Sequence, residues 1–312
     1  MKSPEHQLSF NLIDQPWIVC VTANGTQTLS LRQVFDGTAV PIQILGDSPT
    51  QDYAVLRVLL AIFWRAHLGE SAASRSWDEW FISKRQELVE TGRDDAVLSY
   101  LESHRSRFDL FHPETPFMQV ATLDTSKSTR QTVSRILPDS EQDYFTMRTH
   151  KGRQSLAFDE AARWLIHTQA YDYSGIKSGA TGDPRVKGGK GYPLGTGWAG
   201  MTGGTVIHGH TLLETLLLNT VEDALSPSAN GDRPVWEREA DSAAQRNDRA
   251  GKLATPPAVQ PQGASDLATW QSRRVRLFPD NERVSAVLVS NGDQIPDAGK
   301  NVFGDPMTPY RF

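Results

Sequence analysis

The 312-residue sequence has almost no cysteine, and Cys20 is the single thiol. One thiol excludes an internal disulfide and any zinc site built from several cysteines. Cys20 lies in an apolar, strand-like run, which is typical of a small core residue. We therefore expect a protein of a reducing compartment, the cytoplasm.

The sequence also lacks a hydrophobic run long enough to cross a membrane. Its most apolar stretch, Tyr53–Trp64, reaches about half of the ~20 residues that a spanning helix needs, and Arg57 interrupts it. The polar N-terminal region lacks the apolar segment of a secretory signal. We expect residues 53–64 to form a buried helix and the protein to have no membrane partner.

An excess of positive charge is absent as well, since the formal net charge is −5 at pH 7. The surface as a whole therefore does not attract nucleic acid, and any contact with a polyanion must be local. A hydrophobic content of 38% over this length is enough to build a sizeable core.

The order of apolar and turn residues predicts an α+β fold of helices and short antiparallel strands in one large irregular domain. Strands are expected around the Asn24-Gly25 turn and in a C-terminal meander from residue 269 to 290. Residues 223–265 lack a hydrophobic period, which predicts a mobile insertion with Trp236 as a possible anchor. Helices are expected at 53–64, 76–89, 95–108, 158–170 and 212–225.

Glycine is abundant in one stretch, residues 175–204, where it takes eleven of thirty positions. Glycine permits left-handed backbone and close approach of a second molecule, and Lys177, Arg185, Lys187 and Lys190 lie among the glycines. A flexible linker is the alternative, but the stretch also contains large apolar residues. The composition favours a loop that contacts a polyanion and leads directly into a helix N-terminus near Thr211.

No catalytic, metal or cofactor motif rises above background. Residues 195–200 match G-x-G-x-x-G but neither follow a strand nor enter a helix, and no phosphate-binding loop ending in G-K-[ST] is present. His208 and His210 have no further ligands nearby in the sequence. The aromatic segment 144–148 either anchors its polar loop to the core or stacks on a nucleic-acid base.

Several longer motifs, found in order along the chain, resemble one known family. They are FNLIDQPWI at 10–18, FDLFHPETPFMQV at 108–120, FTMR at 145–148, AARWLIHTQA at 161–170, GIKSGATGDPRVKGGKGYPLGTGWAG at 175–200, TWQSRRVRLF at 269–278 and GDPMTPYR at 304–311. Together they resemble CasA, the large subunit of the type I-E CRISPR surveillance complex Cascade, over nearly the whole sequence.

The resemblance implies a non-catalytic subunit that recognises the protospacer-adjacent motif (PAM) of target double-stranded DNA, mainly from the minor groove. It also implies contact with the 5′ handle of the CRISPR RNA (crRNA) through the loop with Phe145, Met147 and Arg148. Lys300 is expected to be the lysine finger. The family's glycine loop lies within 175–197, where two segments fit it, 175–179 and 187–191. The candidate DNA contacts in these segments are Gly175, Lys177, Ser178, Gly179, Lys187, Gly188, Gly189, Lys190 and Gly191.

The implied partners are the other Cascade subunits, crRNA, target DNA and a helicase-nuclease. The chain departs from the family by ending at Phe312, before a C-terminal four-helix bundle and a glutamine wedge, so residues 1–312 are expected to form the N-terminal domain. For residues 1–312, the resemblance therefore implies no residues for strand separation or for recruitment of the helicase-nuclease. Two other functions remain open: an enzyme that binds a nucleotide phosphate, and an architectural subunit that holds the crRNA handle.

Overall fold

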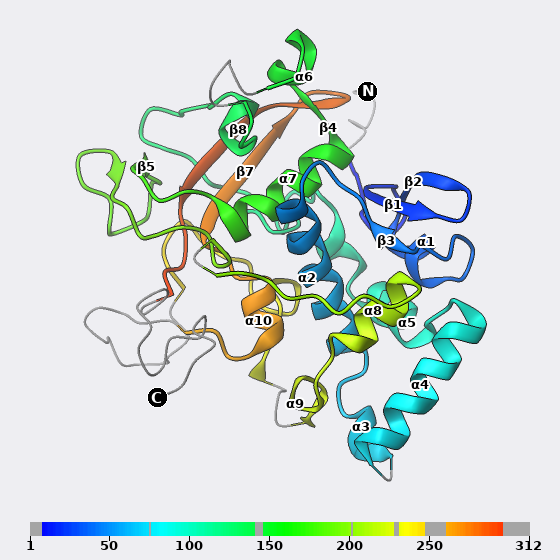
Figure 1. Cartoon of the computed structure of the whole chain (residues 1–312). Coiled ribbons are helices and arrows are strands. Elements are labelled where there is room, and N and C mark those ends of the chain that lie inside the picture. The colour runs from blue at the N-terminus through cyan, green and yellow to red at the C-terminus, as the bar shows by residue number, and fades with distance from the viewer. Residues whose placement is uncertain are drawn as a thin grey trace, which may run out of the picture.

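Helix α2 (Pro49–Ala66) is the central element of the computed structural model, which describes residues 8–74, 76–140, 146–200, 202–227, 231–246 and 260–295 (Figure 1). The Ser48 hydroxyl caps the helix by accepting a hydrogen bond from the Gln51 N–H, and Pro49 occupies the first turn. Most of its residues are buried, as the apolar run predicted. No helix in the described ranges is long and apolar enough to cross a membrane.

Two small antiparallel sheets flank the helices. The first has the order β2-β1-β3, with β1 (Ile18–Thr22), β2 (Gly25–Leu29) and β3 (Gln43–Ile44). Its hairpin turns at Ala23 and Asn24, one residue before the predicted Asn24-Gly25 pair, because Gly25 already pairs with Thr22. The second has the order β4-β8-β7, with β4 (Leu156–Ala157), β7 (Arg273–Pro279) and β8 (Arg283–Asn291). The α+β fold and both hairpins are confirmed.

Helix α7 (Phe158–Tyr171) packs along α2 and joins it to the second sheet. Ten consecutive residues of α7, from Ala161 to Ala170, are buried, so apolar contacts surround this helix on nearly all sides. The remaining helices are α1 (Leu31–Phe35), α3 (Glu70–Ala73), α4 (Trp77–Thr91), α5 (Asp95–Ser103), α6 (His150–Gln154), α10 (Ala264–Ala268) and the 3₁₀ turns η1 (Arg105–Phe108), η2 (Val133–Ile136) and η4 (Val235–Glu237).

The expected helix over 212–225 is split in two, α8 (Leu212–Leu218) and α9 (Glu222–Leu225). Thr220 explains the break, because its hydroxyl donates to the Leu216 carbonyl and accepts a hydrogen bond from the buried Trp64 indole at 3.0 Å. A threonine that bonds backbone in this way competes with helix continuation. The single-helix prediction was therefore wrong at residues 219–221.

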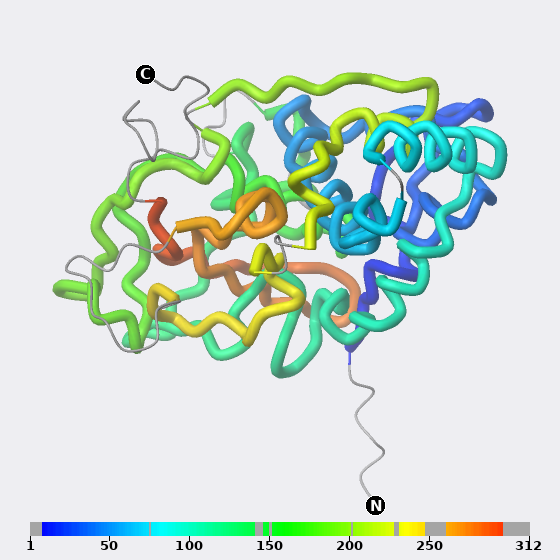
Figure 2. The backbone as a smooth tube through the Cα atoms, turned by 90° about the horizontal axis from the view of Figure 1, so that it is seen from below, coloured from blue at the N-terminus to red at the C-terminus, as the bar shows by residue number. Residues whose placement is uncertain are grey.

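The glycine-rich stretch does not run directly into α8, contrary to the expectation from the sequence. An extended segment, 203–209, separates them and crosses one side of the molecule, visible as the yellow-green tube in Figure 2. Gly204 lies flat against the ring of Tyr53 on α2, where a Cβ atom would collide with the ring. Close packing, and not a ligand, accounts for this glycine.

Part of the expected insertion at 223–265 packs into the core. The buried Trp236 indole lies 5.0 Å from the Phe108 ring and donates to the Tyr100 hydroxyl at 2.6 Å. Residues 228–230 and 247–259 lie outside the described ranges. Mobility of the insertion therefore stays a prediction.

Candidate nucleic-acid interface

The glycine-rich stretch folds into a hairpin. Strands β5 (Lys177–Ser178) and β6 (Lys190–Gly191) pair antiparallel and are joined by residues 179–189. This connection ends in a two-residue turn, across which Lys187 and Lys190 exchange two backbone hydrogen bonds of 3.1 Å. The turn residues Gly188 and Gly189 have φ values of 57° and 73°. Positive φ at both central positions defines the turn that suits a tight hairpin and strongly favours glycine.

The tip of this hairpin is open. No heavy atom lies within 4 Å of the position that a Cβ would take at Gly188 or Gly189. Within the described part of the chain, the N–H groups of both glycines make no hydrogen bond. The tip therefore presents two unpaired backbone donors to the solvent, between the exposed side chains of Lys187 and Lys190.

The other glycines of the predicted site serve packing. A Cβ on Gly179 would lie 2.7 Å from the Gly189 carbonyl oxygen, and one on Gly191 would lie 2.8 Å from Asn291 Nδ2. Gly175 packs against the ring of Tyr173, with 3.2 Å from the corresponding position to the nearest ring carbon. Gly179 thus lets the hairpin backbones approach each other, and Gly191 lets the hairpin approach the end of β8.

Lys177 points into the protein. Its side chain is 1% exposed, and its ammonium lies 3.2 Å from Asp172 Oδ2 and donates to the Tyr173 carbonyl at 2.8 Å. Burial lowers the pKa of Lys177 to about 8, although Asp172 opposes this change. Lys177 therefore fixes the base of the hairpin in this structure, whereas the neighbouring Ser178 is partly exposed.

Asp172 joins three cations below the hairpin. Arg135 donates to both of its carboxylate oxygens, at 2.7 and 3.1 Å, and Arg273 Nε donates to Oδ2 at 2.5 Å. Lys177 is the third cation. Burial alone would raise the pKa of Asp172, but these cations hold it below its usual value. The carboxylate thus stays ionised and ties together α7, η2, β5 and β7.

The second predicted element, the loop with Met147 and Arg148, lies at the rim of a cavity of about 700 Å³. Met147 is 97% exposed, while Arg148 pairs with Glu160 and lies 3.6 Å from Asp139. Phe145 lies outside the described residues, and so does Lys300. Their predicted contacts with crRNA and DNA stay predictions.

Aromatic and cationic side chains line the cavity beside this loop. His167 lies in its wall, 3.1 Å from the Thr50 hydroxyl, and burial lowers the pKa of this histidine to about 4. The imidazole is therefore neutral at physiological pH. The other aromatic or cationic side chains of the lining are Arg135, Arg148, Trp164, Tyr171 and Tyr173.

The described ranges contain no group of three or more His, Cys, Asp or Glu residues that could hold a metal ion. The His210 backbone N–H donates to the Glu214 carboxylate at 2.6 Å, and His210 lies one residue before Thr211, the N-cap of α8. Sequence reasoning missed Asp172 and Arg273, because nothing local marks a contact between residues 101 positions apart.

Comparison with known proteins assigns this fold to a family of CRISPR-associated proteins. A family model described as CRISPR-associated protein Cse1 matches residues 11–312. The chain therefore belongs to the Cse1 (CasA) family.

Three relatives illustrate the similarity. The crystal structure of Thermobifida fusca Cse1 is 44% identical, with a TM-score of 0.76, and the match covers 92% of this chain and 52% of that chain. The CasA/Cse1 protein of Thermus thermophilus is 27% identical over 97% of this chain and 55% of its own length. A chain of a CRISPR RNA-guided surveillance complex shares the fold, with a TM-score of 0.67 and 20% identity over 97% of this chain and 58% of that chain. The chain thus spans about half the length of these relatives.

Proposed function

We propose that this chain is a non-catalytic subunit of an RNA-guided CRISPR surveillance complex and reads the PAM of duplex DNA through the 187–190 hairpin tip. The open glycine turn between two exposed lysines carries the proposal. The minor groove is about 6 Å wide and presents a degenerate set of acceptors. A backbone without Cβ atoms can enter so narrow a groove, and its free N–H groups suit those acceptors.

Family membership supports the assembly with other Cascade subunits and crRNA, as does the shared fold of a surveillance-complex chain. RNA-guided systems leave target sequence to base pairing and require the protein to recognise a short duplex motif. A local contact of this kind is compatible with a net charge of −5. Lys300 remains the proposed lysine finger, although it lies outside the described residues.

We place the crRNA handle near the exposed Met147, at the mouth of the cavity with Arg148. The aromatic rings suit the stacking of unpaired nucleotides, whereas both guanidinium groups of the lining are paired with carboxylates, Arg135 with Asp172 and Arg148 with Glu160. The available volume of about 700 Å³ is enough for one nucleotide. No catalytic role is assigned to this cavity, and a helicase-nuclease partner is a proposal for the full-length protein.

The test substitutes valine for Gly188 and Gly189 in the assembled complex and measures binding to duplexes with matched and scrambled PAMs. Added side chains force a left-handed backbone to strain and block close approach. We expect weaker binding to the matched PAM and normal crRNA-complex assembly. Gly25→Val is a matched control, because Gly25 lies next to the turn of the β1–β2 hairpin and also has a positive φ, 102°, and open surroundings.

Unchanged PAM affinity in the Gly188 and Gly189 variants would contradict the proposal. It would favour the architectural alternative, in which the chain holds the crRNA handle and never reads DNA. Reproducible nucleotide hydrolysis by the purified chain, abolished by Lys190→Ala, would instead favour the enzyme alternative.

A further inference from the structure

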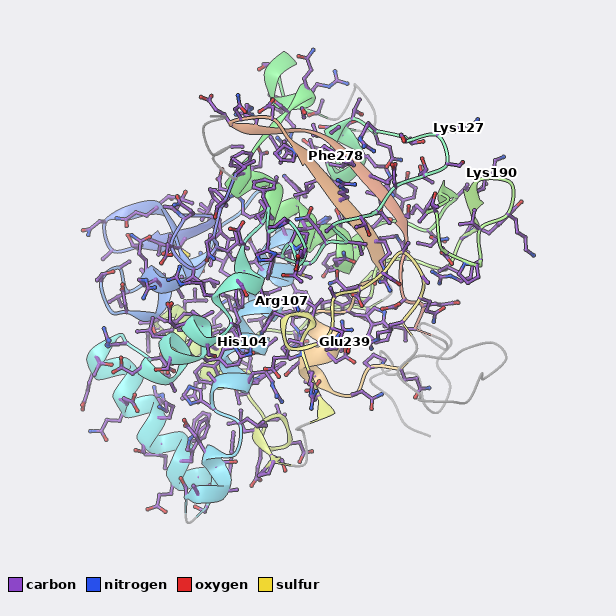
Figure 3. The ribbon with its side chains drawn as sticks, turned by 180° about the vertical axis from the view of Figure 1, so that it is seen from behind. His104, Arg107, Lys127, Lys190, Glu239 and Phe278 are labelled. Carbon is purple, nitrogen blue, oxygen red and sulfur yellow. The ribbon has the colours of Figure 1, made fainter. Side chains whose placement is uncertain are left out.

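A second loop lies beside the hairpin, and nothing in the proposed function uses it. The segment 124–130 contacts residues 180–181, which follow β5 in the hairpin. The Thr181 N–H donates to the Asp124 carbonyl at 2.9 Å, and Thr125 and Ala180 form a β-bridge. Figure 3 shows Lys127 and Lys190 projecting from the same edge of the molecule. The two loops therefore form one continuous surface.

Hydrogen bonds hold this second loop in one conformation. The Ser128 N–H donates to the Thr125 carbonyl at 2.9 Å, which closes a β-turn with Ser126 and Lys127 at its tip. The Asp124 carboxylate accepts from the Thr125 N–H at 2.8 Å and from the Ser128 hydroxyl at 3.2 Å. Ser128 takes a positive φ of 47°, which is uncommon outside glycine. The turn is a built structure that displays Lys127.

Lysines and arginines are used differently on this surface. Lys127, Lys187 and Lys190 are exposed, and none of them forms an ion pair with another residue in the described part of the chain. The arginines nearby are engaged in the fold: Arg185 pairs with Asp183 at 2.9 Å, and Arg130 pairs with Asp124 at 3.3 Å.

The acidic groups of the same surface are therefore already neutralised. Asp183 is almost fully buried beneath Arg185, and Asp124 is occupied by its turn and by Arg130. Arg130 also stacks on the Phe278 ring, with 3.7 Å from its guanidinium carbon to the ring centre. Three exposed lysines without an ion pair in the described part of the chain therefore stand together on a protein whose net charge is −5.

We propose that the Lys127 turn is a phosphate-binding element that grips the backbone of the same duplex whose groove the hairpin tip enters. A tip in the minor groove has a phosphate backbone on either side, so a rigid neighbouring turn meets one of them. Lysine binds phosphate as a point charge and carries no sequence information. The turn thus contributes affinity and register, and the hairpin tip contributes PAM discrimination.

Duplex DNA fits this surface better than the crRNA handle does. Unpaired RNA is held mainly by aromatic stacking. The aromatic ring at this turn, Phe278, is covered by the guanidinium groups of Arg130 and Arg276, and the guanidinium carbon of Arg276 lies 4.9 Å from the ring centre. The three free charges stand on two adjacent turns, which suits a regular array of phosphates. This inference rests on the proposed function.

The test compares Lys127→Ala with the unaltered protein in the assembled complex, using matched-PAM and scrambled duplexes over a salt series. Each phosphate contact contributes about 0.9 to the slope of log affinity against log salt. We expect Lys127→Ala to lower the affinity for both duplexes by a similar factor. Because the variant makes one phosphate contact fewer, this factor should shrink about 3.5-fold between ~50 and ~200 mM salt. Ser126→Ala, on the same turn, is the uncharged control, and Lys127→Arg should restore binding.

The outcomes separate this inference from the proposed function. If Lys127→Ala leaves duplex affinity and salt slope unchanged while the Gly188 and Gly189 variants lose PAM binding, the inference fails and the proposed function stands. A loss confined to the matched PAM would assign Lys127 to sequence readout and overturn a phosphate contact. Weaker retention of crRNA with unchanged duplex binding would assign the turn to RNA and also overturn it.

Discussion

The ammonium of Lys177 lies 3.2 Å from Asp172 Oδ2, so a lysine of the glycine-rich stretch is tied to the C-terminal end of α7. The same carboxylate binds Arg135 and Arg273, and all four side chains are largely buried. The base of the hairpin therefore depends on a cluster with more positive than negative charge. Asp172 holds that cluster together.

Removal of this carboxylate charge should destabilise the fold. Asp172→Asn leaves three buried cations without a counter-charge, and breaking a buried pair in this way costs about 3–5 kcal/mol. Urea unfolding followed by circular dichroism measures the change. Asp95→Asn is the comparison, because that carboxylate pairs with Arg93 at the surface and should matter little. Equal unfolding midpoints for the two variants would show that Asp172 does not hold the cluster.

His67 should make stability depend on pH. The imidazole is fully buried, with Glu70 2.8 Å from Nδ1 and Asp94 2.8 Å from Nε2. Burial alone would lower its pKa, but the hydrogen bonds that the imidazolium donates to Asp94 and Glu70 raise the pKa above the usual 6.5.

Because the folded-state pKa is the higher one, the stabilisation is complete below pH 6.5 and is lost as the pH rises through the folded-state pKa. Unfolding free energies measured at several pH values for the wild type and His67→Gln should diverge most at the acidic end. Direct NMR titration of the imidazole gives a second readout if the variant folds poorly. A titration midpoint below 6.5 would refute the prediction.

Trp236 should anchor the segment that the sequence analysis expected to be mobile. Its indole is buried against Phe108 and Phe117, and truncation of such a ring costs about 3–5 kcal/mol. We expect Trp236→Ala to lower the urea midpoint strongly. Val221→Ala, at a side chain that is 63% exposed, should leave the midpoint nearly unchanged. A midpoint for Trp236→Ala close to that control would mean that the segment is not anchored there.

Features encoded within a few residues were predictable from the sequence. The first hairpin and the helix N-terminus at Thr211 depend on neighbours in the chain. Both form, although the hairpin turns at Ala23 and Asn24, one residue before the expected pair. The glycine-rich stretch was also marked by composition alone. Its open turn at Gly188 and Gly189 follows from the local need for positive φ.

The division of roles within that stretch was not predictable. Lys177 and Lys190 look alike in sequence, yet the first is buried on Asp172 and the second is exposed. The burial of Lys177 depends on Arg135 and Arg273, which reach Asp172 from 37 and 101 residues away. Pairing between charges far apart in the chain leaves no periodic pattern in the sequence. The contact between the Lys127 turn and the glycine-rich stretch also joins distant segments, so it leaves no such pattern either.

The two lysines therefore offer a direct test of the hairpin. Lys190→Ala removes an exposed charge at the tip, so duplex affinity should fall on matched and scrambled PAMs, with the salt slope reduced by about 0.9. Lys177→Met keeps most of the buried volume and removes a charge that faces Asp172. It should alter urea unfolding and leave the salt slope of duplex binding as in the wild type.

Both measurements are made on each variant, in the assembled complex for DNA binding and on the isolated subunit for unfolding. Lys84→Ala serves as a control for loss of one positive charge, because Lys84 is paired with Glu87 on α4. A salt slope lowered by Lys177→Met as much as by Lys190→Ala would mean that Lys177 leaves Asp172 when DNA binds. The base of the hairpin would then rearrange when the duplex binds. The contact between Lys177 and Asp172 would form only in the free subunit.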